Sequence, residues 1–178
     1  MTRLSIDLET YSSRDIKKVG TYAYVDAPDF EILLFGFAFD EDPVQVIDLA
    51  QGEKLPADVL RALFSPDVLK TAYNANFEMT CLSKYFKKKL NAGQWSCTSV
   101  LALTLGLPGY LAGVAQALNF PDDKQKMSIG RRLIEYFCKP CKPTKTNGGR
   151  LRNLPQHDGK KWEIGRASCR ERVSRVVV

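Results

Sequence analysis

The sequence contains no hydrophobic run long enough to cross a bilayer. Its longest apolar stretch, residues 32–39, is far shorter than the roughly 20 residues that a membrane-spanning helix needs. The N-terminus also lacks the charged and apolar regions of a signal peptide. We therefore expect an intracellular, cytoplasmic protein that makes no membrane contact.

Histidine is scarce, and the cysteines are odd in number. We expect the one histidine, His157, to lie at the surface or to cap a helix. The cysteines number five, and an odd count favours reduced thiols over a disulfide framework. Cys138 and Cys141 lack a second metal-ligating pair, so we interpret them as loop thiols and not as a zinc site. Cys81 and Cys97 are expected in the core.

The remaining composition is that of one globular domain. The 178 residues are 44% hydrophobic and 26% charged, which excludes disordered and fibrous proteins, and there is no internal repeat. The net charge of +6 is weak evidence for a polyanionic partner, because the distribution of charge matters more than its sum.

Strand patterns come first along the chain. Alternation predicts strands at 3–8, 31–39 and 44–49, and the short acidic turn at 40–43 requires the last two to be antiparallel. A fourth strand is predicted at 68–73. Helices are predicted at 56–64, 76–89, 98–105, 110–118 and 126–137, with another opening at 157–163. This order predicts an α/β fold with a mixed sheet flanked by helices.

Two carboxylates share one face of the first strand. In RLSIDLETYS, Leu4, Ile6 and Leu8 point to one face, so Asp7 and Glu9 point to the other. Like charges on a covered strand face repel and lose solvation, which is costly unless a cation lies between them. The alternative is a solvated strand end beside a turn.

A third carboxylate is expected near this pair. In TAYNANFEMTCL, Glu78 falls in the first turn of a helix that follows the strand at 68–73. Three acids at one sheet edge would suit Mg²⁺, and two such ions about 4 Å apart can activate water for phosphodiester hydrolysis. The alternative is an ordinary first-turn acid favoured by the helix dipole.

These segments resemble a known family. IDLETYS and NANFE resemble the first two motifs of the four-carboxylate 3′–5′ exonucleases on the ribonuclease H-like fold. APDFEILLFGFAF and CKPTKTNGGRLRNLP extend the resemblance, over residues 1–162, to the proofreading domain of phage-type family A DNA polymerases.

The resemblance implies a ribonuclease H-like mixed sheet whose first three strands are antiparallel. It implies that Asp7, Glu9 and Glu78 are catalytic and hold two ions, Mg²⁺ or Mn²⁺. It further implies hydrolysis at the 3′ end of single-stranded DNA in a bacterial or phage-infected cell, with a polymerase domain in the full-length parent.

The last part of the sequence departs from the family, which supplies an Asp on a late helix, four residues after a Tyr or five after a His. No Asp and no Tyr follow Trp162. Residues 163–178 carry four arginines and end in VVV, which matches neither the preceding helix nor the family. We expect a domain at 1–162, truncated before the last catalytic helix, an artefactual or disordered tail at 163–178, and impaired activity.

A basic loop at 138–155 is expected to contact phosphates, which would make binding salt-dependent. The predicted nucleic-acid contacts are Thr10, Asn76, Lys142, Lys145, Arg150 and Arg152. Phe77 is expected to anchor its helix in the core. Alternatively, the basic loop is simply a solvent-exposed face. For the chain as a whole there are two alternative functions: a ribonuclease of the same superfamily, or a non-catalytic module that binds single strands. The sequence does not indicate an oligomeric state.

Overall fold

The computed structural model of the chain describes residues 2–119 and 128–176. The strands are β1 (Thr2–Tyr11), β2 (Glu31–Phe39), β3 (Gln45–Asp48), β4 (Val68–Ala72) and β5 (Trp95–Cys97). The helices are α1 (Ile16–Val25), α2 (Ala57–Phe64), α3 (Ala75–Tyr85), α4 (Thr98–Thr104), α5 (Leu111–Ala117), α6 (Ser128–Phe137) and α7 (Gly159–Val176). Short 3-10 turns are η1 (Leu49–Gln51), η2 (Ala92–Gln94) and η4 (Pro155–His157).

The five strands form one mixed sheet in the order β3-β2-β1-β4-β5. β1 pairs antiparallel with β2, and β2 with β3, whereas β1–β4 and β4–β5 are parallel. This confirms the predicted α/β fold and its antiparallel first three strands. No helix of the described residues is both long and apolar enough to cross a membrane.

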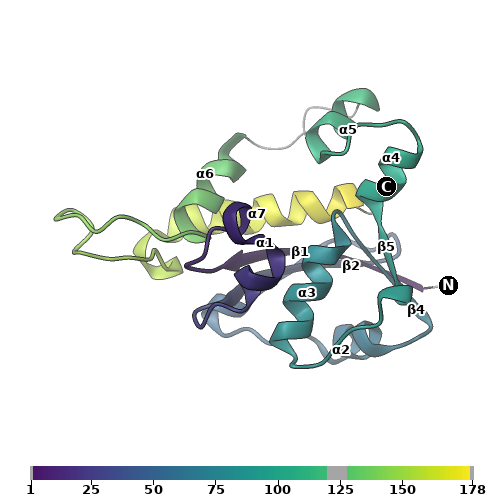
Figure 1. Cartoon of the computed structure of the whole chain (residues 1–178), viewed down its shortest axis with the longest axis horizontal. Helices are drawn as coiled ribbons and strands as arrows, with labels where there is room; N and C mark the ends of the chain where they lie inside the picture. The colour runs from purple at the N-terminus through teal and green to yellow at the C-terminus, as the bar shows by residue number, and fades with distance from the viewer. Residues whose placement is uncertain (1, 120–127, 177–178) are drawn as a thin grey trace.

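Helices cover both faces of the sheet. Figure 1 shows α2 and α3 on one face and α7 along the other, with α6 outside α7. Leu4, Ile6 and Leu8 of β1 belong to the core beneath α1, α2 and α3. The opposite core contains Trp162 and Cys169 of α7, so the odd-numbered side chains of β1 point toward α7.

Two helices differ from the sequence prediction. α1 was not predicted, because Gly20, at φ 75°, kinks the segment and interrupts its apolar spacing; the Asp15 side chain caps its start. α3 ends at Tyr85 and not at 89, since Lys87 adopts φ 51° just beyond it. The first two residues of the predicted helix 126–137 lie outside the described residues.

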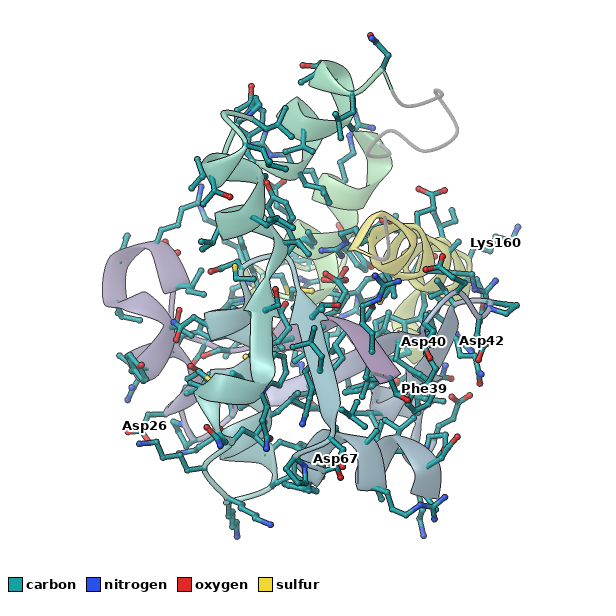
Figure 2. All side chains as sticks on the ribbon, turned by 90° about the vertical axis from the view of Figure 1, so that its right-hand side faces the viewer. Asp26, Phe39, Asp40, Asp42, Asp67 and Lys160 are labelled. Carbon is teal, nitrogen blue, oxygen red and sulfur yellow. The ribbon has the colours of Figure 1, made fainter. Side chains whose placement is uncertain are left out.

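The acidic turn between β2 and β3 lies beside the beginning of β1. Figure 2 shows Asp40 and Asp42 beside Phe39 at this turn. The Asp40 carboxylate accepts a hydrogen bond of 2.8 Å from the backbone N–H of Arg3, whose guanidinium pairs with Glu41 at 2.7 Å. The turn is thereby tied to the beginning of β1.

Helix α7 continues through the expected domain boundary at residue 162. It is helical to Val176, and Cys169 and Val173 are fully buried against the sheet. The expectation for 163–178 was an artefactual or disordered tail. In the structure Cys169 and Val173, at positions i and i+4 of a helix, lie on the same face, which packs on the sheet. Gly36 of β2 makes room for them: a Cβ at Gly36 would lie 2.7 Å from Val173 Cγ2 and 2.9 Å from Cys169 Sγ.

Substituting Gly36 by alanine is expected to push α7 away from the sheet. We expect Gly36→Ala to lower the free energy of unfolding by about 1–3 kcal/mol, the usual cost of overpacking a core. Urea unfolding measures this. The matched control is Gly165→Ala in α7, where a Cβ meets nothing within 4 Å; it should stabilise by up to about 1 kcal/mol. Equal effects of the two substitutions would contradict the close contact.

Candidate active site

The acid pair lies on the α7 face of β1. Asp7 and Glu9 point away from the Leu4–Leu8 core, as the alternation predicts. Asp7 pairs with Gly36 of β2, and the register between β1 and β2 shifts between Glu9 and Thr10. Such a bulge bends the strand locally and re-aims its side chains. The two carboxylates are therefore placed together at the position where β1 begins to leave the regular ladder.

Glu78 approaches the pair from α3. The strand β4 ends at Ala72, Asn74 takes a left-handed conformation at φ 70°, and Glu78 follows in the first turn of α3. Its side chain is almost fully buried, and its Oε2 has no hydrogen-bond partner among the described residues. Burial, and then the charge of Asp7, raise the pKa of Glu78 well above its ordinary value. Asp7 and Glu78 are thus close enough to repel each other.

A guanidinium from α7 lies on the acid pair. Arg172 Nε is 3.5 Å from Asp7 Oδ2, and its terminal nitrogen forms an ion pair with Glu9 Oε1. The side chains of Arg172, Asp7 and Glu9 are 17%, 14% and 12% exposed, so solvent screens these pairs little. One cation therefore bridges the two carboxylates that the sequence predicted to require one.

Two thiols contact the same carboxylates. The Cys169 thiol donates to Asp7 Oδ2, and the Cys138 thiol donates to Glu9 Oε2, each at 3.7 Å. Burial raises the pKa of Cys138 to about 12. Burial and the Asp7 charge raise the pKa of Cys169 well above its ordinary value, so both sulfurs keep their protons. Cys141 instead donates to the Arg150 carbonyl in the loop.

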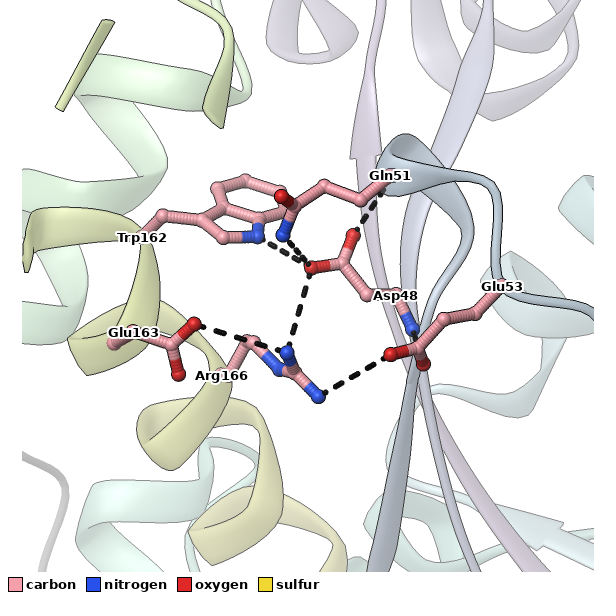
Figure 3. A network of polar contacts seen from close by, with 6 residues as sticks. All are labelled: Asp48, Gln51, Glu53, Trp162, Glu163 and Arg166. Carbon is pink, nitrogen blue, oxygen red and sulfur yellow. Dashed lines mark hydrogen bonds and ion pairs between the residues drawn. The ribbon is translucent and has the colours of Figure 1, made fainter. Parts of the chain in front are cut away.

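The start of α7 is fixed by a buried carboxylate that the sequence analysis did not identify. Figure 3 shows Asp48, at the end of β3, accepting from the Trp162 indole N–H at 2.6 Å and from the Gln51 amide at 2.6 Å. Arg166 lies 3.8 Å from the same carboxylate and 3.7 Å from Glu53. In the sequence, the helical spacing of Trp162, Arg166 and Cys169 indicates that the three residues share one face of a helix that continues past residue 162.

The residues present do not fit a divalent ion in this arrangement. Three carboxylates are the hard oxygen donors that Mg²⁺ prefers. Within the described part of the chain, however, no group of three or more His, Cys, Asp or Glu side chains is arranged to hold a metal ion. The Arg172 guanidinium lies on two of the three acids.

A cationic groove opens beside Glu9. Its volume is about 760 Å³, and Phe77 and Tyr24 form part of its apolar wall. Phe77 also packs against the core beneath α3, as expected. The cations on its lining are Arg14, Lys18, Lys139, Lys142 and Arg172. A groove with aromatic walls and a cationic rim can accept a single strand, whose bases stack and whose phosphates pair with the cations.

The predicted nucleic-acid contacts divide into two groups. Thr10 and Lys142 line the groove, with the Thr10 hydroxyl bonded to the Tyr24 hydroxyl at 2.9 Å. Arg152 instead pairs with Glu31 and stacks 3.8 Å above the Tyr11 ring.

Asn76, Lys145 and Arg150 also lie outside the groove lining. Asn147 organises the basic loop by bonding the backbone of Thr144, Gly149 and Arg150.

Four groove cations were missed from the sequence: Arg14, Lys18, Lys139 and Arg172. The first two occur in SSRDIKK, directly after the acidic motif, so their proximity along the chain was a usable signal. Lys139 lies in the basic loop at 138–155 but is not among the nucleic-acid contacts predicted from the sequence. His157 is a cap, as predicted: its Nδ1 accepts the backbone N–H of Leu154 at 2.9 Å.

Comparison with known proteins gives one close sequence relative. No family model matches the chain. The chain is 60% identical over 169 residues to a DNA polymerase of Bacillus phage SP02. The alignment covers 95% of this chain and 26% of that protein. The chain is a homologue of part of a phage DNA polymerase. It spans about a quarter of the length of this curated relative.

Solved nuclease structures resemble the fold of this chain. Trypanosoma brucei RNase D, solved as a GMP complex, superposes with a TM-score of 0.55 at 15% identity, covering 99% of this chain and 50% of that one. Brucella melitensis NrnC with bound Mg²⁺ gives a TM-score of 0.47 at 15% identity, covering 98% and 83%. The likeness to RNase D supports the expected mixed α/β sheet flanked by helices.

The chain should lose stability when the Asp48–Trp162 hydrogen bond is removed. We expect Trp162→Phe to lower the free energy of unfolding by about 1–3 kcal/mol more than Trp95→Phe, because a buried carboxylate loses a donor. Trp95 is the matched control, since its indole N–H has no partner among the described residues. Urea unfolding of both variants gives the difference, and equal losses would argue against this anchor.

Proposed function

We propose that the chain is the 3′–5′ exonuclease part of a phage-type DNA polymerase. The observation that carries the proposal is a set of neighbouring acids beside a cationic groove, in a homologue of part of a DNA polymerase. Asp7 and Glu9 share the Arg172 guanidinium, the charge of Asp7 acts on Glu78, and Glu9 lines the groove. The substrate is the 3′ end of single-stranded DNA. The rest of the parent protein supplies the polymerase domain.

In a complete site that Arg172 does not occupy, Asp7, Glu9 and Glu78 would hold two Mg²⁺ or Mn²⁺ ions, and such ions would supply water activation and charge stabilisation for phosphodiester hydrolysis. Glu78 has a buried oxygen free for such a ligand role within the described structure. The groove residues of this chain orient the strand, with Lys139 and Lys142 beside its phosphates and Phe77 beside its bases.

The activity of this chain is impaired. Helix α7 carries Cys169 and Arg172 toward the acid pair, and neither Asp nor Tyr occurs in α7. We propose that only the last part of residues 163–178 is foreign to the exonuclease, because the alignment with the phage relative spans 169 of the 178 residues and so includes at least seven of these sixteen. A fourth carboxylate is absent from the position next to Asp7.

The relative at 60% identity favours DNA over RNA as the substrate, since it is a DNA polymerase. RNase D shares the fold at 15% identity, and a fold hosts many activities. The catalytic carboxylates distinguish the proposal from a module that only binds single strands.

Restoring a carboxylate on α7 should restore exonuclease activity. The Cys169 side chain of α7 contacts Asp7, so Cys169→Asp places the missing acid there. Combined with Arg172→Met, it should raise the rate on 5′-labelled single-stranded DNA with Mn²⁺ on the order of a hundredfold over the unmodified chain. Products should shorten one nucleotide at a time from the 3′ end.

The matched control is Cys169→Asn with Arg172→Met, which has the same shape without the charge. Adding Asp7→Asn to the restored chain should abolish the gain. A restored chain that stays inactive, or that degrades RNA and not DNA, would contradict the proposed function.

Strand binding should depend on the groove and not on the whole basic loop. We expect Lys142→Ala to weaken single-stranded DNA binding and to reduce the slope of log affinity against log salt by roughly 0.7, the effect of one phosphate contact. Lys145→Ala is the matched control, because Lys145 is exposed in the same loop but does not line the groove. Fluorescence anisotropy across a salt series measures both; equal slope changes would place the strand elsewhere.

A further inference from the structure

The geometry points to Arg172 as a built-in cation that competes with divalent metal for Asp7 and Glu9. This inference rests on the proposed function, since it concerns the same carboxylates. It states that docking of α7 and metal binding at the acid pair exclude each other in this chain. Arg172 is thus an intramolecular blocking group.

Arg172 contacts both carboxylates. Arg172 Nε lies 3.5 Å from Asp7 Oδ2 while its terminal nitrogen pairs with Glu9. A guanidinium presents several donors in one plane and matches two neighbouring carboxylates better than a single ammonium would. A metal ion bound by Asp7 and Glu9 would require the same oxygen atoms.

The surroundings make this pairing strong. All three side chains are less than a fifth exposed, and the Cys138 and Cys169 thiols occupy further sides of the carboxylates. Removing one partner of a buried ion pair leaves an uncompensated charge, which is strongly destabilising. The acid pair therefore needs a cation, and in this structure α7 provides it.

The helix is held in the position that delivers Arg172. Cys169 and Val173, three residues before and one after it, are buried over Gly36 of β2. At the other end, Trp162 and Arg166 fix the helix to Asp48. Arg172 thus reaches the acids through a helix anchored at both ends, and a metal ion must displace a packed element to bind.

The two binding events are linked. If a metal ion and Arg172 compete for one pair of carboxylates, the metal must weaken the docking of α7 by the same factor by which α7 weakens the metal. This reciprocity gives two independent readouts, metal affinity and helix protection, and neither requires catalysis.

Metal affinity is measured by titrating Mn²⁺ into the full chain and counting free ions by electron paramagnetic resonance. We expect Arg172→Met to bind Mn²⁺ at least about tenfold more tightly than the unmodified chain. The matched control is Arg170→Met, which removes the same charge from an exposed position of the same helix. It should bind as weakly as the unmodified chain.

The outcomes separate this inference from the proposed function. Tight Mn²⁺ binding by the unmodified chain that Asp7→Asn abolishes would keep the carboxylate site and overturn the blocking role of Arg172. Failure of Arg172→Met to bind Mn²⁺ more tightly than the unmodified chain would overturn the blocking role, whereas the proposed function is overturned only if the chain with Cys169→Asp and Arg172→Met also stays inactive. Equal gains in the Arg170 and Arg172 variants would show a general charge effect and overturn the blocking role.

Hydrogen exchange on the unmodified chain keeps the inference testable if Arg172→Met fails to fold. Raising Mg²⁺ should speed amide exchange in α7 around residues 166–176 and leave α2 unchanged. If α7 stays equally protected, or becomes more protected, as the Mg²⁺ concentration rises, then metal and Arg172 do not compete.

Discussion

The arrangement of this protein depends on the repulsion between two carboxylates on the covered face of one strand. Asp7 and Glu9 are placed together by the two-residue period of β1, and the helices on that face remove most of their water. Such a pair persists only with a compensating positive charge. In this structure the Arg172 guanidinium supplies that charge, and the Cys138 and Cys169 thiols contact the same carboxylates.

The compensation comes from α7, whose position is decided by contacts far from the acids. Asp48 receives the Trp162 N–H at the start of the helix, and Gly36 leaves space for Cys169 and Val173 near its other end. These are packing and hydrogen-bond constraints that carry no catalytic requirement. They nevertheless determine which α7 side chain meets the carboxylates.

The groove shows a similar separation between charge and position. Basic residues occur in both α1 and the loop after α6, and the fold brings Lys18 and Lys139 to one rim. Other cations of the same loop are committed to local structure, as Arg152 is by Glu31 and Tyr11. The number of lysines and arginines in a segment therefore says little about which of them face a bound strand.

The sequence by itself determined four of the five strands and most helices, and it predicted that Asp7, Glu9 and Glu78 lie near one sheet edge; it did not predict β5. Those properties follow from local periodicity and from the rule that a helix begins where its strand ends. Only the tertiary structure decided that Arg172 would meet the acid pair and that Lys142, and not Lys145, would face the groove. Such contacts join residues far apart in the chain, and no local pattern specifies the distance between them.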